Sequence, residues 1–121
     1  MRSRTVLWSV SIVAGLAACC WGGRFLGTAT LGAELSMPPR WRIPEVPAGA
    51  TVVEDTRSCG SGGCGWSLTL QPAAGQTAEE LAREMGVAEW RNEPPTLTDP
   101  AFVSVGSHIR AGQVVVYVGY R

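Results

Sequence analysis

The sequence predicts an α+β fold, a small ββαββ domain in which one helix packs on a mainly antiparallel four-stranded sheet, preceded by an N-terminal transmembrane helix. Three observations lead to this prediction. A run of nineteen uncharged, mostly apolar residues, 5–23, follows a short basic start. Two segments before residue 71 and two after residue 101 have the β-prone composition or period-two alternation of strands. Between them, 77–86 has apolar residues at helical spacing.

The N-terminal segment, 1–24, has the length and composition of a membrane anchor. About twenty apolar residues cross the hydrocarbon core as a helix. Trp8 and Trp21 lie near the two ends of the uncharged run, where indole rings favour the membrane interface. Arg2 and Arg4 should hold the N-terminus in the cytoplasm. We therefore expect a single-pass protein of the cell membrane whose C-terminal domain lies outside the cytoplasm.

A cleaved lipoprotein signal is the alternative for the same segment. Residues 16–19, Leu-Ala-Ala-Cys, match the bacterial lipobox, in which the cysteine is lipidated and becomes the mature N-terminus. Cys19 is therefore a candidate lipidation site. The chain stays apolar through Cys20 and Trp21, which favours the transmembrane helix. Either anchor places the rest of the chain outside the cytoplasm.

Residues 25–45 have the composition of a juxtamembrane, proline-rich spacer. Four of the eight prolines fall within 37–47, and proline fixes φ and removes a backbone donor. Such a segment is stiff and extended, and would hold the domain on the order of 30 Å from the membrane at ~3.1 Å per residue. The folded extracytoplasmic domain would then occupy 46–121.

The first half of this domain predicts a hairpin and a helix. Strands are expected at 50–55 and 66–70, with a glycine-rich connection between them. The helix should begin with a capping box formed by Thr77 and Glu80. Gly86 would supply the left-handed residue at its C-terminus.

The second half predicts a loop and a second hairpin. Residues 92–100 contain three prolines and are expected to form a loop. Strands at 102–109 and 113–120 should turn at 110–112. Each places apolar residues on one face: Val103, Val105 and Ile109 on the first strand, and Val114, Val116, Val118 and Tyr120 on the second. A domain of about 75 residues has a small core, so a covalent cross-link is expected to support it.

Cys59 and Cys64 form the main candidate site. Paired cysteines outside the cytoplasm usually form a structural disulfide, and the glycine-rich residues between these two can bend into disulfide geometry. Redox activity would more typically use two intervening residues. Metal binding needs four ligands, and only His108 would add an obvious third. The intervening Gly-Ser-Gly-Gly could also present amides to an anion, without the Lys of a P-loop.

The remaining polar residues do not assemble a catalytic set. The chain has one histidine, His108, and two aspartates, Asp55 and Asp99, from which no acid–base pair or nucleophile can be built. We therefore expect no enzyme, no catalytic, cofactor-binding or metal residues, and no cofactor. Trp66 and Trp90 could line a binding patch, although packing around the disulfide hairpin is expected for Trp66.

The charge balance argues against a nucleic-acid partner. From residue 25 onward there are seven Arg and ten acidic residues, a net charge of −3 by 7 − 10, and the chain has no Lys. Nucleic-acid binding requires clustered positive charge that displaces counterions.

Two resemblances accompany these observations. The string 58–64, Ser-Cys-Gly-Ser-Gly-Gly-Cys, with the later Ala-Glu-Glu-Leu-Ala and a C-terminal valine- and tyrosine-rich strand, resembles an uncharacterised group of small, membrane-anchored actinobacterial proteins. The resemblance spans about 45–121 and the anchor, although in that group a Trp usually follows the second Cys directly, and here Gly65 intervenes. It implies a location and a disulfide, and no activity.

Residues 75–87 and 112–116 are also similar to the peptidoglycan-binding LysM pattern, a strand, two helices and a strand. That resemblance implies a second helix after Val87, where this chain has prolines.

These observations favour a noncatalytic, membrane-tethered accessory domain that contacts an unknown protein or envelope partner. The alternatives are a cell-wall glycan-binding module of the LysM type and an envelope thiol–disulfide redox protein.

Overall fold

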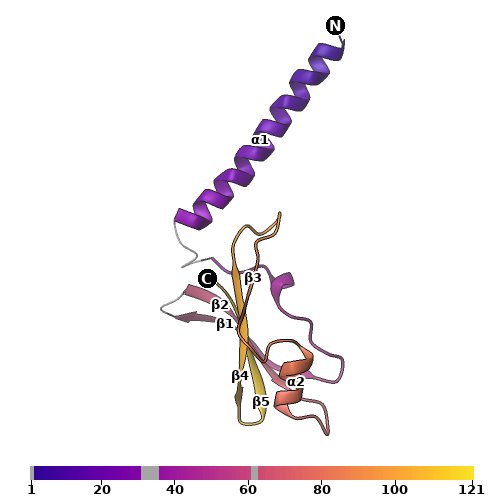
Figure 1. The fold of residues 1–121 in the computed structure, drawn as a ribbon, viewed down its shortest axis with the longest axis vertical. Coiled ribbons are helices and arrows are strands. Elements are labelled where there is room, and N and C mark those ends of the chain that lie inside the picture. Colours follow the sequence, from indigo (N-terminus) through magenta and orange to yellow (C-terminus); the bar gives the residue numbers. More distant parts are fainter. Residues whose placement is uncertain (1, 31–35, 61–62) are drawn as a thin grey trace. The chain divides into compact units, whose positions relative to one another are not determined.

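The structure, a computed structural model, describes residues 2–30, 36–60 and 63–121. The chain divides into two compact units, Met1–Gly32 and Ala33–Arg121. The first unit is one helix, α1 (Arg2–Thr30), drawn in indigo to purple in Figure 1. Its stretch Arg4–Gly27 contains an 18-residue window with a mean hydropathy of 1.7 and is long and apolar enough to cross a membrane. The predicted N-terminal apolar helix is therefore confirmed.

The second unit is built on a five-stranded antiparallel sheet (Figure 1) with the strand order β1-β2-β5-β4-β3. The strands are β1 (Thr51–Gly60), β2 (Gly63–Gln71), β3 (Arg91–Glu93), β4 (Val103–Arg110) and β5 (Gln113–Tyr120). One short helix, α2 (Ala78–Glu84), follows β2, and a 3-10 turn, η1 (Arg40–Arg42), precedes β1. The predicted α+β class, with an antiparallel sheet and one helix, is confirmed.

The number of strands differs from the prediction by one. The strand β3 lies at the start of the expected loop, where its residues pair with Val103–Val105 of β4. Three residues are too few for a period-two pattern to appear in a sequence. The prolines at 94 and 95 directly follow β3, and they led to the prediction of a loop. Tertiary pairing with β4 therefore decides the conformation here.

The first hairpin is longer than predicted. Pairing continues through Cys59 opposite Cys64 to Gly60 opposite Gly63, so the strands extend into the glycine-rich connection. Only Ser61 and Gly62 lie between them, and both are outside the described residues. Because the strands extend this far, Cys59 and Cys64 lie directly opposite each other in the register.

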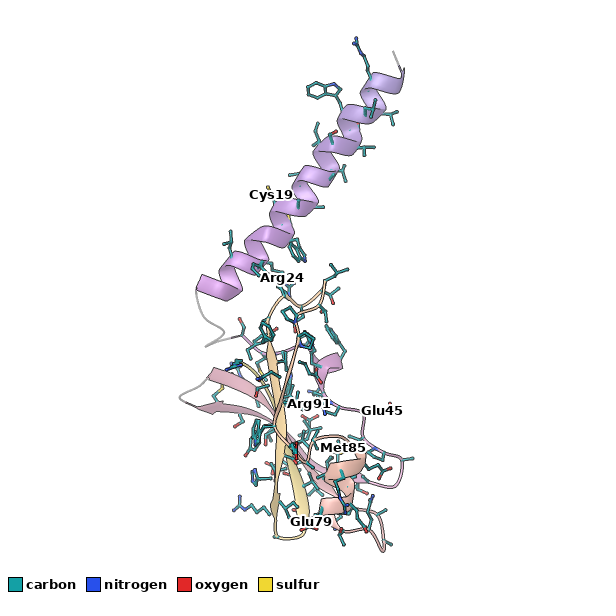
Figure 2. All side chains as sticks on the ribbon, viewed as in Figure 1. Cys19, Arg24, Glu45, Glu79, Met85 and Arg91 are labelled. Carbon is teal, nitrogen blue, oxygen red and sulfur yellow. A yellow bond between two sulfur atoms is a disulfide. The ribbon has the colours of Figure 1, made fainter. Side chains whose placement is uncertain are left out.

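The helix α2 forms as its sequence predicts. The Glu80 amide donates to the Thr77 hydroxyl at 3.2 Å, and the Thr77 amide donates to the Glu80 carboxylate at 3.0 Å, which completes the capping box. Gly86 has a φ of +67°, a conformation that L-residues rarely adopt. Met85 is buried and Glu79 is exposed, as Figure 2 labels them. The buried side of α2 packs in one cluster with the inward-facing residues of β2, β4 and β5.

A second element covers the same face of the sheet. The Trp66 indole N–H donates to the Pro38 carbonyl at 2.8 Å, and the Arg40 guanidinium lies 4.4 Å from the centre of the Trp66 ring. Ile43, Val46 and Ala50 are packed against the hydrophobic core. Residues 38–50 therefore contact the folded unit.

The expected spacer at 25–45 thus differs from the structure, because its last part is docked rather than free. The compact unit begins at Ala33, before the expected domain start at residue 46. Residues 31–35 of the expected spacer lie outside the described residues. The stiffness that proline gives to residues 38–47 lowers the entropy lost on docking them.

A buried ion pair fixes this docked segment. Arg42 Nε donates to Asp99 Oδ2 at 3.1 Å, with side chains only 4% and 1% exposed. Two further nitrogens of the Arg42 guanidinium lie 3.1 Å from the Pro94 carbonyl. The Tyr120 hydroxyl donates to the other Asp99 carboxylate oxygen at 2.9 Å. The charges of Arg42 and Asp99 are therefore both paired and hydrogen-bonded, which a buried ion requires.

We expect Asp99→Asn to lower the free energy of unfolding by about 3 kcal/mol, because it removes the nearer and more buried of the two carboxylates that pair with Arg42, the other being Glu93 at 3.6 Å. Urea unfolding of the full-length protein in lipid nanodiscs, followed by near-ultraviolet circular dichroism, measures the change. The matched control is Asp55→Asn, which removes the exposed ion pair with Arg40 and should cost less than about 1 kcal/mol. Equal losses in the two variants would contradict a special role for the buried pair.

Candidate functional site

The predicted disulfide between Cys59 and Cys64 is present, with the two Cα atoms 4.1 Å apart. The cysteines are directly opposite each other in the β1–β2 register, so the backbone pairing itself brings the sulfurs together. Cys64 is buried at 8% exposure, whereas Cys59 is exposed. The Arg57 guanidinium donates to Cys64 Sγ at 3.4 Å.

The other cysteines lie on α1. Cys19 and Cys20 are free and exposed, and Figure 2 labels Cys19 on the helix. Lipidation of Cys19 stays a prediction. Within the described residues, no group of three or more His, Cys, Asp or Glu could hold a metal ion. The sequence suggested that the Gly-Ser-Gly-Gly segment could present amides to an anion. Two of its residues, Ser61 and Gly62, lie outside the described residues.

The sheet has two faces with different surroundings. Side chains alternate between them along each strand, and the face that carries Leu68, Val105 and Val116 is the one packed with Leu81 of α2. We call the opposite side the back face. From β4 it carries Ser104, Gly106 and His108, and from β5 it carries Val115, Tyr117 and Gly119, which are their register neighbours.

Three aromatic rings gather on the back face. The rings of Trp90 and Tyr117 are nearly parallel, with an interplanar angle of 13° and centroids 6.4 Å apart. His108 stacks on Tyr117 at 5.4 Å and 23°. Trp90 is 61% exposed, and His108 is exposed as well. We call Trp90, Tyr117 and His108 the aromatic strip.

The Trp90 ring can lie on the sheet because residue 106 is glycine. A Cβ atom at Gly106 would lie 2.2 Å from Trp90 Cδ2 and 2.5 Å from Cε3, well inside contact distance. Any larger residue would therefore displace the ring. The indole therefore lies close to the β4 backbone at Gly106.

A groove of about 350 Å³ borders the aromatic strip. Its lining includes Ser58, Gly65, Trp90, Ser104, Tyr117 and Gly119. Gly65 and Gly119 are paired in the β2–β5 register and form a low floor without side chains. A Cβ atom on Gly65 would meet the Val118 carbonyl oxygen at 2.4 Å, so this close approach of two strands requires glycine. The volume is within the range of small-ligand sites, about 300–1,000 Å³.

The groove offers hydroxyl, backbone and aromatic groups. None of its described lining residues is Asp, Glu, Lys or Arg. The groove can therefore bind a neutral ligand by stacking and hydrogen bonding. An ionic ligand would receive no counter-charge from this part of the described chain.

Sequence reasoning found part of this site. It singled out Trp66 and Trp90 as a candidate patch, and both line the groove. Trp66, however, directs its indole N–H to Pro38 and packs against the core, as expected for it. Tyr117 was missed. The alternation of side chains along the strand could have revealed it. Tyr117 falls on the face opposite to Val116 and Val118, together with residues of the solvent side.

Replacing both Cys59 and Cys64 with Ser should lower the free energy of unfolding by roughly 2 kcal/mol, since closing a loop of about six residues restricts the unfolded chain. Thermal unfolding of the full-length protein, with and without a thiol reductant, measures this. The reductant should destabilise the wild type and leave the double variant unchanged. Cys19 and Cys20 are free in either case, so thiol labelling is assigned to individual cysteines by peptide mass spectrometry. Labelling of Cys59 and Cys64 in the untreated native protein would contradict the disulfide, and rapid turnover with a thiol donor would favour the redox alternative.

Comparisons of this chain with protein family models, with curated proteins and with solved structures found no match. The resemblance to small membrane-anchored actinobacterial proteins stays a prediction. The segment implied to be LysM-like has one described helix, α2, followed by β3 and a hairpin, whereas the LysM pattern has two helices there.

Proposed function

We propose that this protein is a noncatalytic, membrane-tethered accessory protein that binds an envelope partner through the back face of its sheet. The observation that carries the proposal is the difference between the two faces. One face is closed by α2 and by residues 38–50. The other presents the aromatic strip and the groove beside it. Aromatic side chains with one exposed face are typical of binding surfaces, since they offer a large contact area and little flexibility.

The proposed location rests on the N-terminal helix and on the disulfide. Arg4–Gly27 is apolar enough to span a bilayer, and basic residues at its start favour a cytoplasmic N-terminus. Disulfides persist in oxidising compartments outside the cytoplasm. A lipid on Cys19 would tether the same domain on the same side, so the proposal holds for either anchor.

A redox function is the second candidate, and one arrangement favours it. Cys59 is accessible to a partner thiol, and the Arg57 guanidinium lies beside Cys64. A cation next to a sulfur stabilises the thiolate that leaves when the bond is attacked. The hairpin setting argues for a structural bond, because redox-active pairs more typically open a helix.

The proposed topology predicts that a reporter enzyme active only outside the cytoplasm will be active when fused after Arg121. A reporter that folds only in the cytoplasm should be inactive at the same position. The control is the same pair of fusions on a chain that lacks residues 4–27, in which the two activities should be exchanged. A fusion of the intact chain that works only with the cytoplasmic reporter would overturn the topology.

The proposed binding face predicts where crosslinks form in cells. Asn92 is exposed on β3 and pairs with Ser104, so it lies at the rim of the back face. Glu79 is exposed on α2, which covers the other face (Figure 2). A photoreactive residue at Asn92 should give a discrete adduct with an envelope component, and one at Glu79 should not. Equal crosslinking from both positions would contradict a specific role for the back face.

A further inference from the structure

We propose that the groove on the back face binds a neutral saccharide chain, with one sugar ring stacked on Trp90. This inference rests on the proposed function, because it names the ligand of the same face. It follows from three properties of the groove: an exposed indole held in place, hydroxyl groups beside it, and an uncharged lining.

The position of Trp90 is the first property. Its ring lies close to the Gly106 backbone and stacks with Tyr117, while 61% of the residue is exposed. A pyranose ring presents several C–H groups on one flat side. These groups are weakly positive, and the face of an indole is negative, so the two surfaces attract each other as they exclude water. Because the ring is already fixed, little side-chain entropy is lost on binding.

The hydrogen-bonding groups are the second property. Ser58 and Ser104 come from β1 and β4, on opposite sides of the glycine floor formed by Gly65 and Gly119. A serine hydroxyl both donates and accepts. The hydroxyls around the edge of a sugar ring also do both, so they can exchange their water partners for these side chains without leaving a buried group unpaired.

The uncharged lining is the third property, and it separates saccharides from other ligands. A nucleic acid or another polyanion needs cationic side chains, and the described lining has none. A protein partner would bury about 800 Å² of this unit over a broad surface, whereas the groove is a depression of about 350 Å³ that is open to solvent. A proline-rich peptide also suits aromatic grooves, and it is therefore one of the ligands to be tested.

The test is isothermal titration calorimetry on the full-length protein in lipid nanodiscs, which avoid detergents with sugar headgroups. The probes are cellotetraose and tetra-N-acetylchitotetraose as neutral chains, tetragalacturonate as an anionic chain, and a decaproline peptide. We expect at least one neutral tetrasaccharide to bind. Tetragalacturonate should bind at least about tenfold more weakly, a difference of about 1.4 kcal/mol.

Two variants locate the binding. Trp90→Ala should weaken neutral-saccharide binding at least about tenfold, whereas Trp41→Ala, a matched control that is 57% exposed on η1, should leave it unchanged. Ser104→Arg adds a long side chain to the groove and keeps every aromatic ring, so it should weaken binding as Trp90→Ala does. Near-ultraviolet circular dichroism and the unfolding midpoint check that each variant is folded.

The outcomes separate this inference from the proposed function. No binding of either neutral tetrasaccharide, binding unchanged by both groove variants, or preference for decaproline would overturn the saccharide inference. If crosslinks from Asn92 to an envelope protein persisted in that case, the proposed function would stand with a protein as the partner. If the crosslinks and the saccharide binding were both absent, the back face would not be the binding surface.

Discussion

The Arg42 guanidinium joins three parts of the second unit that are far apart in the sequence. It connects the η1 segment to Asp99 and Pro94 in the loop before β4, and Asp99 in turn accepts a hydrogen bond from Tyr120 at the end of β5. A buried ion pair adds little net stability compared with apolar packing, yet losing one partner is costly. Its effect is therefore to specify one arrangement. With Arg42 in place, residues 38–50 pack against the same core cluster as α2.

That arrangement determines which face of the sheet is free. Side chains alternate along the strands, so α2 and residues 38–50 close one face and leave the other partly open to solvent, although Val115 on that face is only 8% exposed. A face exposed in this way usually carries small polar groups, and most of the back face does. The aromatic strip is the exception. Gly106 lets Trp90 lie against β4, and Gly65 lets β2 approach β5 closely. These two glycines are therefore as important to the groove as the residues that would touch a ligand.

Local signals predicted the local structure well. The capping box of Thr77 and Glu80, the second hairpin and the apolar run of α1 are each contained in fewer than about thirty residues, and each formed as expected. The features that were missed depend on contacts between distant residues. Arg42 and Asp99 are separated by 57 positions, so no local pattern connects them. In the sequence, Arg42 lies in a proline-rich segment and therefore looks like an exposed linker residue. The strand β3 exists through its pairing with β4, and the groove requires β1, β2, β4 and β5 together.

The disulfide and the groove are two parts of one structure rather than two separate sites. Cys64 lines the groove and is followed directly by Gly65 of its floor, and Gly60 and Gly63 at the end of the hairpin also line it. The bond between Cys59 and Cys64 therefore fixes the strand ends that form one wall. In a domain with a small core, strand ends tend to fray, and a fraying wall would have to be ordered again for each binding event. The structural role expected of the disulfide and the binding role proposed for the back face thus have the same physical basis, since the cross-link keeps the groove in its binding shape.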